Sequence, residues 1–318
     1  MQGLRPVFLR FEGVAVVSAS EFGPDRVILG TAQLGMPYGI ANKHGRPDED
    51  AAQAIVSTAL SQGIFAFDTA QGYGCSEAVL GKALAFIAPV KQPDVITKLS
   101  PGLLGEDDTE PMLAASLGRL KRQSLYAVLL HREEHLAFLD GQIGTALAGW
   151  KARGLIRHVG VSVYSPAAAL RALEHPLISI VQIPASVCDR RFEAAGVFSS
   201  ADAKDKEIHI RSVFLQGVLA LGSGQLTGKL RGLADWLHFY HQHCERHALS
   251  PLSVALRWVL RRHLRARVLF GAETPVQVKQ NCELLAQDMP CEPAFWQTLD
   301  NSPPPQSDSF LNPSLWRT

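Results

Sequence analysis

Cysteine is scarce in this sequence. Five cysteines are scattered over 318 residues, an odd number with no CxxC pair: Cys75, Cys188, Cys244, Cys282 and Cys291. A disulfide-built scaffold uses paired cysteines, and a structural zinc site uses clustered ones. The spacing therefore argues against both, and we predict no metal site. It favours a reducing compartment, so we expect a cytoplasmic protein.

Long apolar runs and an excess of one charge are missing as well. No apolar segment approaches the ~20 residues that a membrane-spanning helix needs. Lys and Arg number 31 against 30 Asp and Glu, which leaves a formal net charge of +1. This balance gives no electrostatic reason to expect a nucleic acid or a membrane surface as partner. The stretch 7–17 carries Arg10 and Glu12, and we interpret it as a hairpin or strand pair rather than a signal peptide.

The chain is rich instead in short β-type runs that alternate with amphipathic helical stretches. We expect strands at 26–31, 64–68, 94–98, 125–131, 158–162, 178–183, 208–214 and 267–271. We expect helices at 48–62, 76–86, 109–122, 141–153, 166–173, 191–203 and 275–287, with a further helix and a loop within 219–248. Eight such units predict the α/β class and a closed (β/α)8 barrel, the TIM barrel. The absence of a GxGxxG fingerprint at the first helix weakens the doubly wound alternative.

The predicted barrel is a single domain. We assign residues 1–25 to a short N-terminal extension and 26–289 to the barrel. We assign residues 290–318, with a proline run at 303–305, to an irregular tail that packs on the barrel. No domain boundary or short repeat is visible in the sequence.

Polar residues follow one another at the ends of the predicted strands. Asp68, Lys98 and His131 end the second, third and fourth strands, and Tyr73 lies in the loop after Asp68. A single ionisable residue at a strand end is unremarkable, but the C-terminal ends of barrel strands converge on one site. Four such residues in succession therefore predict an active site there.

The chemistry of these four residues is coherent. A tyrosine of ordinary pKa near 10 is a poor proton donor at neutral pH. We expect a lysine ammonium beside it to lower that pKa, and an aspartate to keep the ammonium charged and oriented. A neutral histidine can donate a hydrogen bond to a carbonyl. The set suits proton delivery to a carbonyl oxygen while a hydride reaches the carbon.

Several motifs carry a resemblance that covers residues 26–285. They are GTAQLG (30–35), DTAQGYGCSE (68–77), the strand-end pieces TK, LLH, GVS and VQ, and GAETPVQVKQN (271–281). In order and placement the sequence resembles the aldo-keto reductase superfamily. The resemblance implies that Tyr73 is the general acid/base, that Asp68 and Lys98 tune it, and that His131 orients the carbonyl.

The resemblance also implies a nicotinamide cofactor and a small-molecule carbonyl substrate. Ser162 and Gln182 match positions that hold the nicotinamide carboxamide, and Gln277 and Asn281 match positions at the adenosine end. The implied cofactor-binding set is Thr31, Ser162, Gln182, Arg211, Gly217, Gly271, Glu273, Gln277 and Asn281. The opening motif and RSVFLQG (211–217) resemble a bacterial branch that is associated with sugar and cell-surface polysaccharide pathways. The implied substrate thus includes sugar derivatives, and the oligomeric state is left unassigned.

Two departures from the family pattern bear on the cofactor. Arg211 stands where many members have a tyrosine that stacks on the nicotinamide, and we expect stacking or substrate contact there rather than a structural salt bridge. Gly271 and Gln277 stand where members that grip the 2′-phosphate often carry Lys or Arg, and Glu273 adds an acid. Lys279 is close in sequence and could supply the missing positive charge. We favour NADP(H) from family habit and keep NAD(H) as an alternative.

Other hypotheses stay open at this point. A regulatory protein that binds a nicotinamide cofactor on the same fold is one, and a non-redox barrel enzyme that uses Lys98 as a Schiff base is another. A zinc site at His243 and His247, four residues apart, is a third possibility. Glu245 is one position late for a HExxH motif, so we favour a solvated helix face there.

Overall fold

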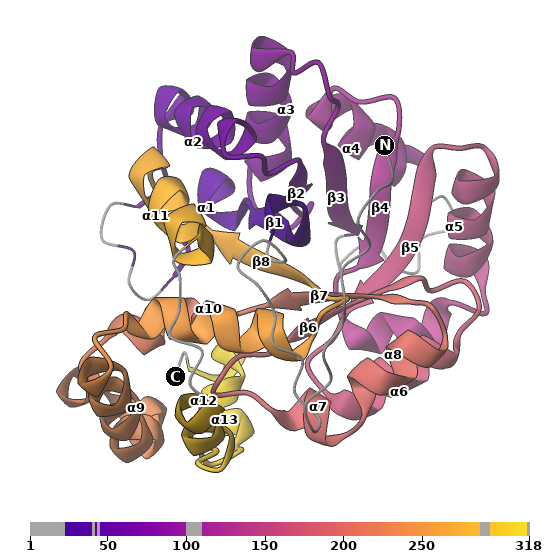
Figure 1. Ribbon diagram of the computed structural model, residues 1–318. Helices are drawn as coiled ribbons and strands as arrows, with labels where there is room; N and C mark the ends of the chain where they lie inside the picture. The colour runs from indigo at the N-terminus through magenta and orange to yellow at the C-terminus, as the bar shows by residue number, and fades with distance from the viewer. Residues whose placement is uncertain (1–22, 40–41, 43–44, 100–109, 287–292, 317–318) are drawn as a thin grey trace, which may run out of the picture.

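The computed structural model describes residues 23–39, 42, 45–99, 110–286 and 293–316. Eight parallel strands pair in chain order and close between β8 and β1, as the sequence predicts (Figure 1). They are β1 (Val27–Gly30), β2 (Ala66–Asp68), β3 (Asp94–Leu99), β4 (Leu125–Leu130), β5 (Ile156–Ser162), β6 (Ile180–Pro184), β7 (Glu207–Arg211) and β8 (Arg267–Gly271). The hairpin predicted at 7–17 lies outside the described residues.

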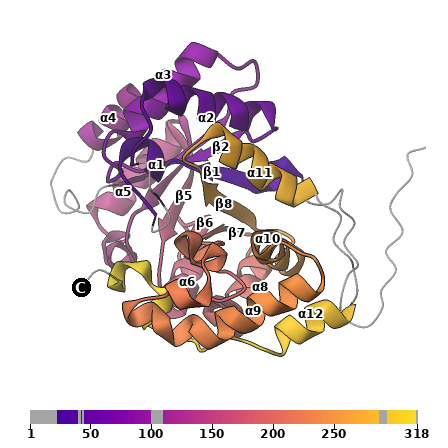
Figure 2. The same ribbon diagram turned by 90° about the vertical axis from the view of Figure 1, so that its left-hand side faces the viewer.

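Helices surround the strands. They are α1 (Ala32–Gly35), α2 (Glu49–Ser61), α3 (Ser76–Ile87), α4 (Glu110–Leu120), α5 (Gln142–Ala152), α6 (Pro166–Glu174), α7 (Arg191–Ala194), α8 (Val197–Ala203), α9 (Ala234–Arg246), α10 (Pro251–Arg262), α11 (Pro275–Ala286), α12 (Pro293–Asp300) and α13 (Asp308–Leu311). Helix α11 packs against α2, so the helical ring closes where the barrel closes (Figures 1 and 2).

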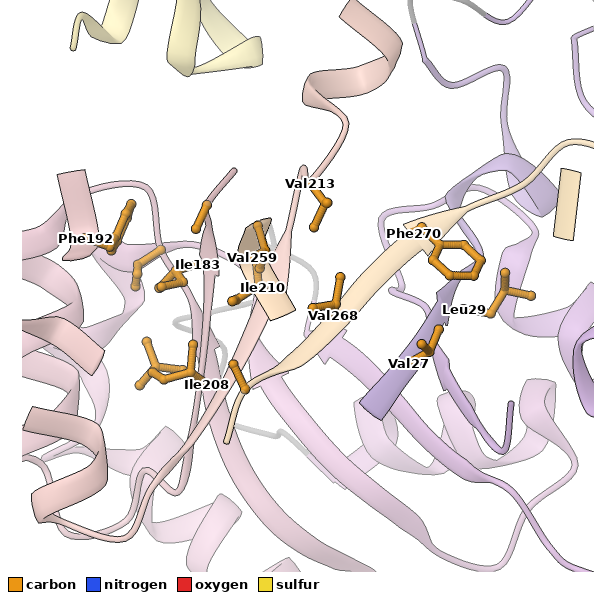
Figure 3. Packing of buried hydrophobic residues seen from close by; sticks show 14 of the residues in the cluster. Val27, Leu29, Ile183, Phe192, Ile208, Ile210, Val213, Val259, Val268 and Phe270 are labelled. Carbon is orange, nitrogen blue, oxygen red and sulfur yellow. The ribbon is translucent and has the colours of Figure 1, made fainter. Parts of the chain in front are cut away.

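Strand alternation divides the apolar residues into two cores. Along β1, Val27 and Leu29 pack outward against the helices, whereas Ile28 belongs to a smaller cluster inside the barrel. Figure 3 shows part of the outer core between β1, β6, β7, β8 and α10. The inner cluster consists of Ile28, Ala66, Ile96, Ala127, Leu129, Ile180 and Leu269. Side chains two residues apart along a strand point to the same face of the sheet. The inward-facing residues that follow the inner cluster therefore lie at the C-terminal ends of the strands.

Three predicted elements differ in the structure. The helix expected at 191–203 is split into α7 and α8, because Gly196 takes a left-handed conformation with φ of 74°. The strand expected at 208–214 ends at Arg211, because Ser212 has a φ of 63°. The long stretch before β8 contains two helices, α9 and α10. Helix α10 begins with Pro251 in its first turn, a favourable position for proline.

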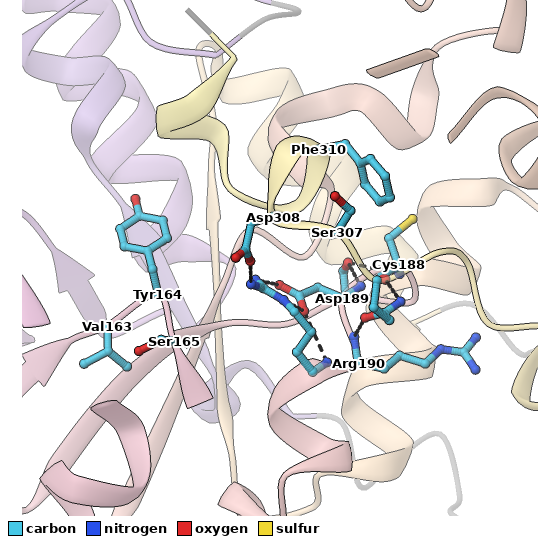
Figure 4. A network of polar contacts seen from close by, with 12 residues as sticks. Val163, Tyr164, Ser165, Cys188, Asp189, Arg190, Ser307, Asp308 and Phe310 are labelled. Carbon is cyan, nitrogen blue, oxygen red and sulfur yellow. Dashed lines mark hydrogen bonds and ion pairs between the residues drawn. The ribbon is translucent and has the colours of Figure 1, made fainter. Parts of the chain in front are cut away.

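The segment predicted as an irregular tail contains the helices α12 and α13. Trp236 and Trp258 of α9 and α10 donate their indole N–H groups to Ser302 O at 2.7 Å and to Asp300 Oδ1 at 2.9 Å. Asp308 forms an ion pair with Arg191, close to the Asp189–Arg190 segment that follows β6 (Figure 4). These contacts join the last described residues to one side of the barrel.

No helix among the described residues combines the length and the apolarity needed to cross a membrane. In the same part of the chain, no group of three or more His, Cys, Asp or Glu side chains could hold a metal ion. His243 and His247 instead bond to backbone carbonyls, at 3.1 Å from Phe295 O and 2.9 Å from His243 O respectively.

Candidate active site

The strand register brings the predicted catalytic residues to one end of the barrel. Asp68 and Lys98 each lie two residues beyond an inner-core residue, Ala66 on β2 and Ile96 on β3. The same count from Leu129 reaches His131, one residue past the end of β4. Because all strands are parallel, these side chains converge at the C-terminal ends of the strands.

Lys98 and Asp68 form a buried ion pair. Their side chains are 1% and 4% exposed, and the Lys98 ammonium donates to Asp68 Oδ1 and, at 3.0 Å, to Thr69 O. Gln182 donates its side-chain N–H to Asp68 Oδ2 at 2.9 Å. Burial lowers the pKa of Lys98, and the charge of Asp68 opposes that shift. The aspartate therefore holds the ammonium charged and oriented.

Tyr73 packs beside this pair. The Lys98 Nζ atom lies over its ring, 4.9 Å from the centroid. Burial and the charge of Asp68 raise the pKa of Tyr73, whereas the charge of Arg211 lowers it. The direction is the opposite of the lowering that we expected from Lys98, because burial outweighs the cations and the ammonium is bonded to Asp68. Tyr73 consequently carries its proton at neutral pH.

His131 completes the group. Its ring meets that of Tyr73 edge to face, with centroids 5.5 Å apart and planes at 86°. Burial, followed by the charges of Lys98 and Arg211, lowers the pKa of His131 to about 3. The imidazole is therefore neutral at physiological pH, as a hydrogen-bond donor to a carbonyl should be. Its buried Nδ1 atom meets no partner among the described residues.

A cavity of about 620 Å³ opens at Asp68 and Tyr73. That volume lies within the range of small-molecule and cofactor sites. Of the predicted site residues, its lining contains Thr31, Asp68, Tyr73, Gln182, Arg211, Gly217, Gly271, Glu273, Gln277 and Asn281. Lys98, His131 and Ser162 lie outside this lining. Ser162 is buried and pairs in register with Gln182 at the end of β5.

Some predicted cofactor residues already have partners in the protein. The Thr31 hydroxyl donates to Asp68 O at 2.9 Å, and Gln182 donates to Asp68 as described. Gln277 accepts from the backbone N–H of Glu273 at 2.7 Å. These bonds give Thr31 and Gln182 a part in holding Asp68 in place, and they give Gln277 a part in shaping the loop after β8.

The turn after β7 forms another part of the cavity wall. Ser212, Gln216 and Gly217 line the cavity, and their φ angles are 63°, 53° and 92°. Leu215 between them has a φ of 47°. Left-handed conformations at non-glycine residues cost about 1–3 kcal/mol each and cluster at ligand-binding sites. The Gln216 side chain also donates to the Tyr38 hydroxyl at 3.3 Å, which ties this turn to the loop after α1.

Sequence reasoning missed two aromatic residues of the site. Tyr38 lines the cavity, and burial raises its pKa to about 12. The central carbon of the Arg211 guanidinium lies over the ring of Tyr164, 4.0 Å from the ring centroid. Tyr38 follows the GTAQLG motif, and Tyr164 comes two residues after Ser162, so proximity to a motif was the available signal. Among the described residues Arg211 forms no ion pair, which disfavours the structural salt bridge considered above.

The residues present fit a nicotinamide dinucleotide. Glycines at 30, 217 and 271 keep side chains off the cavity wall, and a Cβ atom on Gly271 would lie within 2.3 Å of the Gln33 side chain. Arg211 lines this cavity, and its buried Nε atom meets no partner among the described residues. The wall at the end of β8 offers Gln277 and Asn281 as amide groups, with Glu273 as a carboxylate.

The fold and this site define an oxidoreductase of the barrel type that uses a nicotinamide cofactor. The chain belongs to the aldo/keto reductase family, whose model matches residues 26–301. Protein tas of Escherichia coli K12 is similar, with 26% identity over 302 residues that cover 74% of this chain and 85% of that protein.

Solved structures share the fold. The holo form of an aldo-keto reductase from Bacillus halodurans has a TM-score of 0.70 and 21% identity, covering 90% of this chain and 95% of that one. An aldo-keto reductase from Klebsiella pneumoniae in complex with NADPH has a TM-score of 0.66 and 21% identity, covering 90% of this chain and 94% of that one.

Proposed function

We propose that this protein reduces a small-molecule aldehyde or ketone to an alcohol, with Tyr73 as the proton donor. The observation that carries the proposal is the half-buried Tyr73 on the cavity wall, with its pKa raised, beside the Lys98–Asp68 pair and the neutral His131. When bound, the nicotinamide cofactor supplies the hydride that reaches the carbonyl carbon.

Each side chain then has a definite task. Neutral His131 donates a hydrogen bond to the carbonyl oxygen and so orients the substrate. Tyr73 gives its hydroxyl proton to that oxygen as negative charge develops on it. The phenolate left behind is stabilised by the positive charges of Lys98 and Arg211. Asp68 fixes Lys98 in place, and Gln182 fixes Asp68.

For the cofactor we propose NADP(H) with only a modest preference over NAD(H). Family habit and the NADPH complex of a structural neighbour support NADP(H). Gly271 and Gln277 provide no positive charge for a 2′-phosphate, and Glu273 opposes one. We further propose a cytoplasmic enzyme whose substrates include sugar derivatives, in keeping with the sparse cysteines and the motif resemblance.

The Schiff-base alternative lacks a comparable support. Lys98 is 1% exposed, lies outside the cavity lining and is bonded to Asp68, so a substrate carbonyl has no path to its nitrogen. Borohydride treatment in the presence of a carbonyl substrate should therefore leave the mass of the protein unchanged.

The decisive experiment is turnover. Purified protein is given NADPH or NADH and a panel of neutral aldehydes that includes glyceraldehyde, and oxidation of the cofactor is followed by absorbance. We expect reduction that depends on Tyr73. Tight binding of cofactor with no turnover of any carbonyl would favour the regulatory alternative.

A further inference from the structure

Arg211 is the one basic side chain among the described residues that line the cavity. Three acidic residues share that lining, and none is within ion-pair distance of it: Asp68 is bonded to Lys98 and Gln182, and Glu273 and Glu283 lie on the α11 side. A guanidinium without a counter-ion in a cavity leaves a charge for a ligand to neutralise.

The guanidinium is held in place from two sides. Its Nη2 atom donates to Val163 O at 3.0 Å, and its central carbon lies over the ring of Tyr164, 4.0 Å from the ring centroid. Figure 4 shows Val163, Tyr164 and Ser165 in succession after β5. The side chain of Glu133 fixes this segment by accepting from the backbone N–H groups of Tyr164 and Ser165 at 2.7 and 2.9 Å. Arg211 is therefore preorganised rather than freely rotating.

Most N–H groups of the Arg211 guanidinium meet no acceptor among the described residues. A guanidinium carries five N–H groups. Among the described residues the Val163 carbonyl is the acceptor that Arg211 meets, and its buried Nε has no partner. A buried donor without an acceptor is costly, and the forked geometry of guanidinium matches a planar oxyanion that binds through two oxygens.

The geometry points to Arg211 as the residue that binds a carboxylate located next to the substrate carbonyl, as in a 2-oxo acid. The inference rests on the proposed reductase function and assigns its substrate class. Arg211, Tyr73 and Asp68 line the same cavity, so a carboxylate bound to Arg211 would keep the adjoining carbonyl within the space that Tyr73 faces.

The test compares two small molecules that differ in charge and little in shape, oxamate and oxamide. Each is titrated into the protein with saturating NADPH, and binding is followed by calorimetry. We expect oxamate to bind at least about 10-fold tighter, the scale of a charge-assisted hydrogen bond. Arg211→Gln should remove that difference, and Arg211→Lys should keep part of it, because lysine keeps the charge but loses the fork.

Arg157→Gln is the matched control. It removes the same charge from a side chain that is 69% exposed near the start of β5, at the opposite end of the barrel, so the preference for oxamate should persist. Thermal unfolding of each variant establishes that it is folded. Equal affinity for oxamate and oxamide in the unchanged protein would overturn the inference, as would a preference that survives in Arg211→Gln.

A third arm separates the substrate from the cofactor as the source of the oxyanion. NADPH is titrated into Arg211→Gln, and we expect its affinity to fall by less than the affinity for oxamate falls. A loss of NADPH affinity larger than the loss of oxamate affinity would assign Arg211 to the cofactor diphosphate and overturn the substrate role. Failure of the reductase function itself would appear separately, as no turnover of neutral aldehydes by the unchanged protein.

Discussion

The Lys98 ammonium lies over the ring of Tyr73, 4.9 Å from its centroid, while its hydrogen bonds go to Asp68 and to Thr69 O. The cation thus faces the ring of the residue that we propose as the proton donor, while it forms an ion pair with the carboxylate of Asp68. In the proposed mechanism this arrangement leaves a positive charge close by for the phenolate that Tyr73 would form.

Tyr73→Phe removes the hydroxyl and keeps the ring against Lys98 and His131. Carbonyl reduction should fall by at least about 100-fold, the scale of a lost general acid. Cofactor affinity should stay nearly unchanged, and fluorescence titration with NADPH measures it. Turnover close to that of the unchanged protein would mean that another group delivers the proton.

Lys98→Met should damage both activity and stability. It leaves Asp68 as a buried carboxylate without its counter-ion, and breaking a buried pair in this way costs about 3–5 kcal/mol. The pH profile of reduction should also shift, because Tyr73 loses a neighbouring charge. Urea unfolding and initial rates between pH 5 and 9 check both effects.

The double variant Lys98→Met/Asp68→Leu serves as the control for stability. It removes both charges, so part of the lost stability should return, while activity should stay low. Equal stability of the single and double variants would argue against a stabilising ion pair at this position.

The placement of Asp68, Lys98 and His131 could be predicted from sequence because strand alternation and parallel pairing fix which side chains converge. The direction of the pKa shift of Tyr73 could not, since it depends on burial by segments far apart in the chain. The left-handed turn after Arg211 was equally hidden, because three of its four residues with positive φ are not glycine. The start of helix α10 could have been predicted, because its Ser-Pro pair is typical of the first turn of a helix.

His131 should make stability pH-dependent. Its pKa is about 3 in the folded protein, below the ordinary value of 6.5. Below pH 6.5 the unfolded chain therefore takes up a proton that the folded chain does not, so this contribution is present above pH 6.5 and is lost as the pH falls toward 3. Urea unfolding between pH 7.5 and 4.5 measures this effect. As the pH falls, the free energy of unfolding of His131→Asn should decrease less steeply than that of the unchanged protein, by at most about 1.4 kcal/mol per pH unit. Parallel pH curves for the two proteins would show that His131 protonates freely in the folded state.

Gly35→Ala should disturb the Tyr73 loop. A Cβ atom on Gly35 would lie 1.8 Å from Tyr73 O and 2.5 Å from Ser76 N, so the loop must move. We expect a loss of stability of about 1–3 kcal/mol and a lower kcat. Gly149→Ala on α5 is the control, because nothing lies within 4 Å of its added Cβ, and it should be neutral or stabilising by about 0.5–1 kcal/mol. A fully active Gly35→Ala enzyme would show that the position of this loop tolerates movement.

Gln277→Arg tests the cofactor preference. Gln277 lines the cavity close to Glu273, where a 2′-phosphate would meet an amide and a carboxylate rather than a cation. An arginine there should tighten NADPH by about 10-fold or more, the scale of a charge-assisted bond, and leave NADH almost unchanged. Glu273→Ala should shift the preference in the same direction by removing a repulsive charge. The two effects act on one phosphate, so they need not add.

Gln297→Arg provides the matched control for this substitution, because it adds the same charge at an exposed position of α12 outside the cavity lining. It should change neither cofactor affinity. Fluorescence titration of all three variants with NADPH and NADH gives the comparison. If Gln277→Arg tightens both cofactors equally, or neither, the loop after β8 does not face the 2′ position, and the proposed preference for NADPH loses its structural basis there.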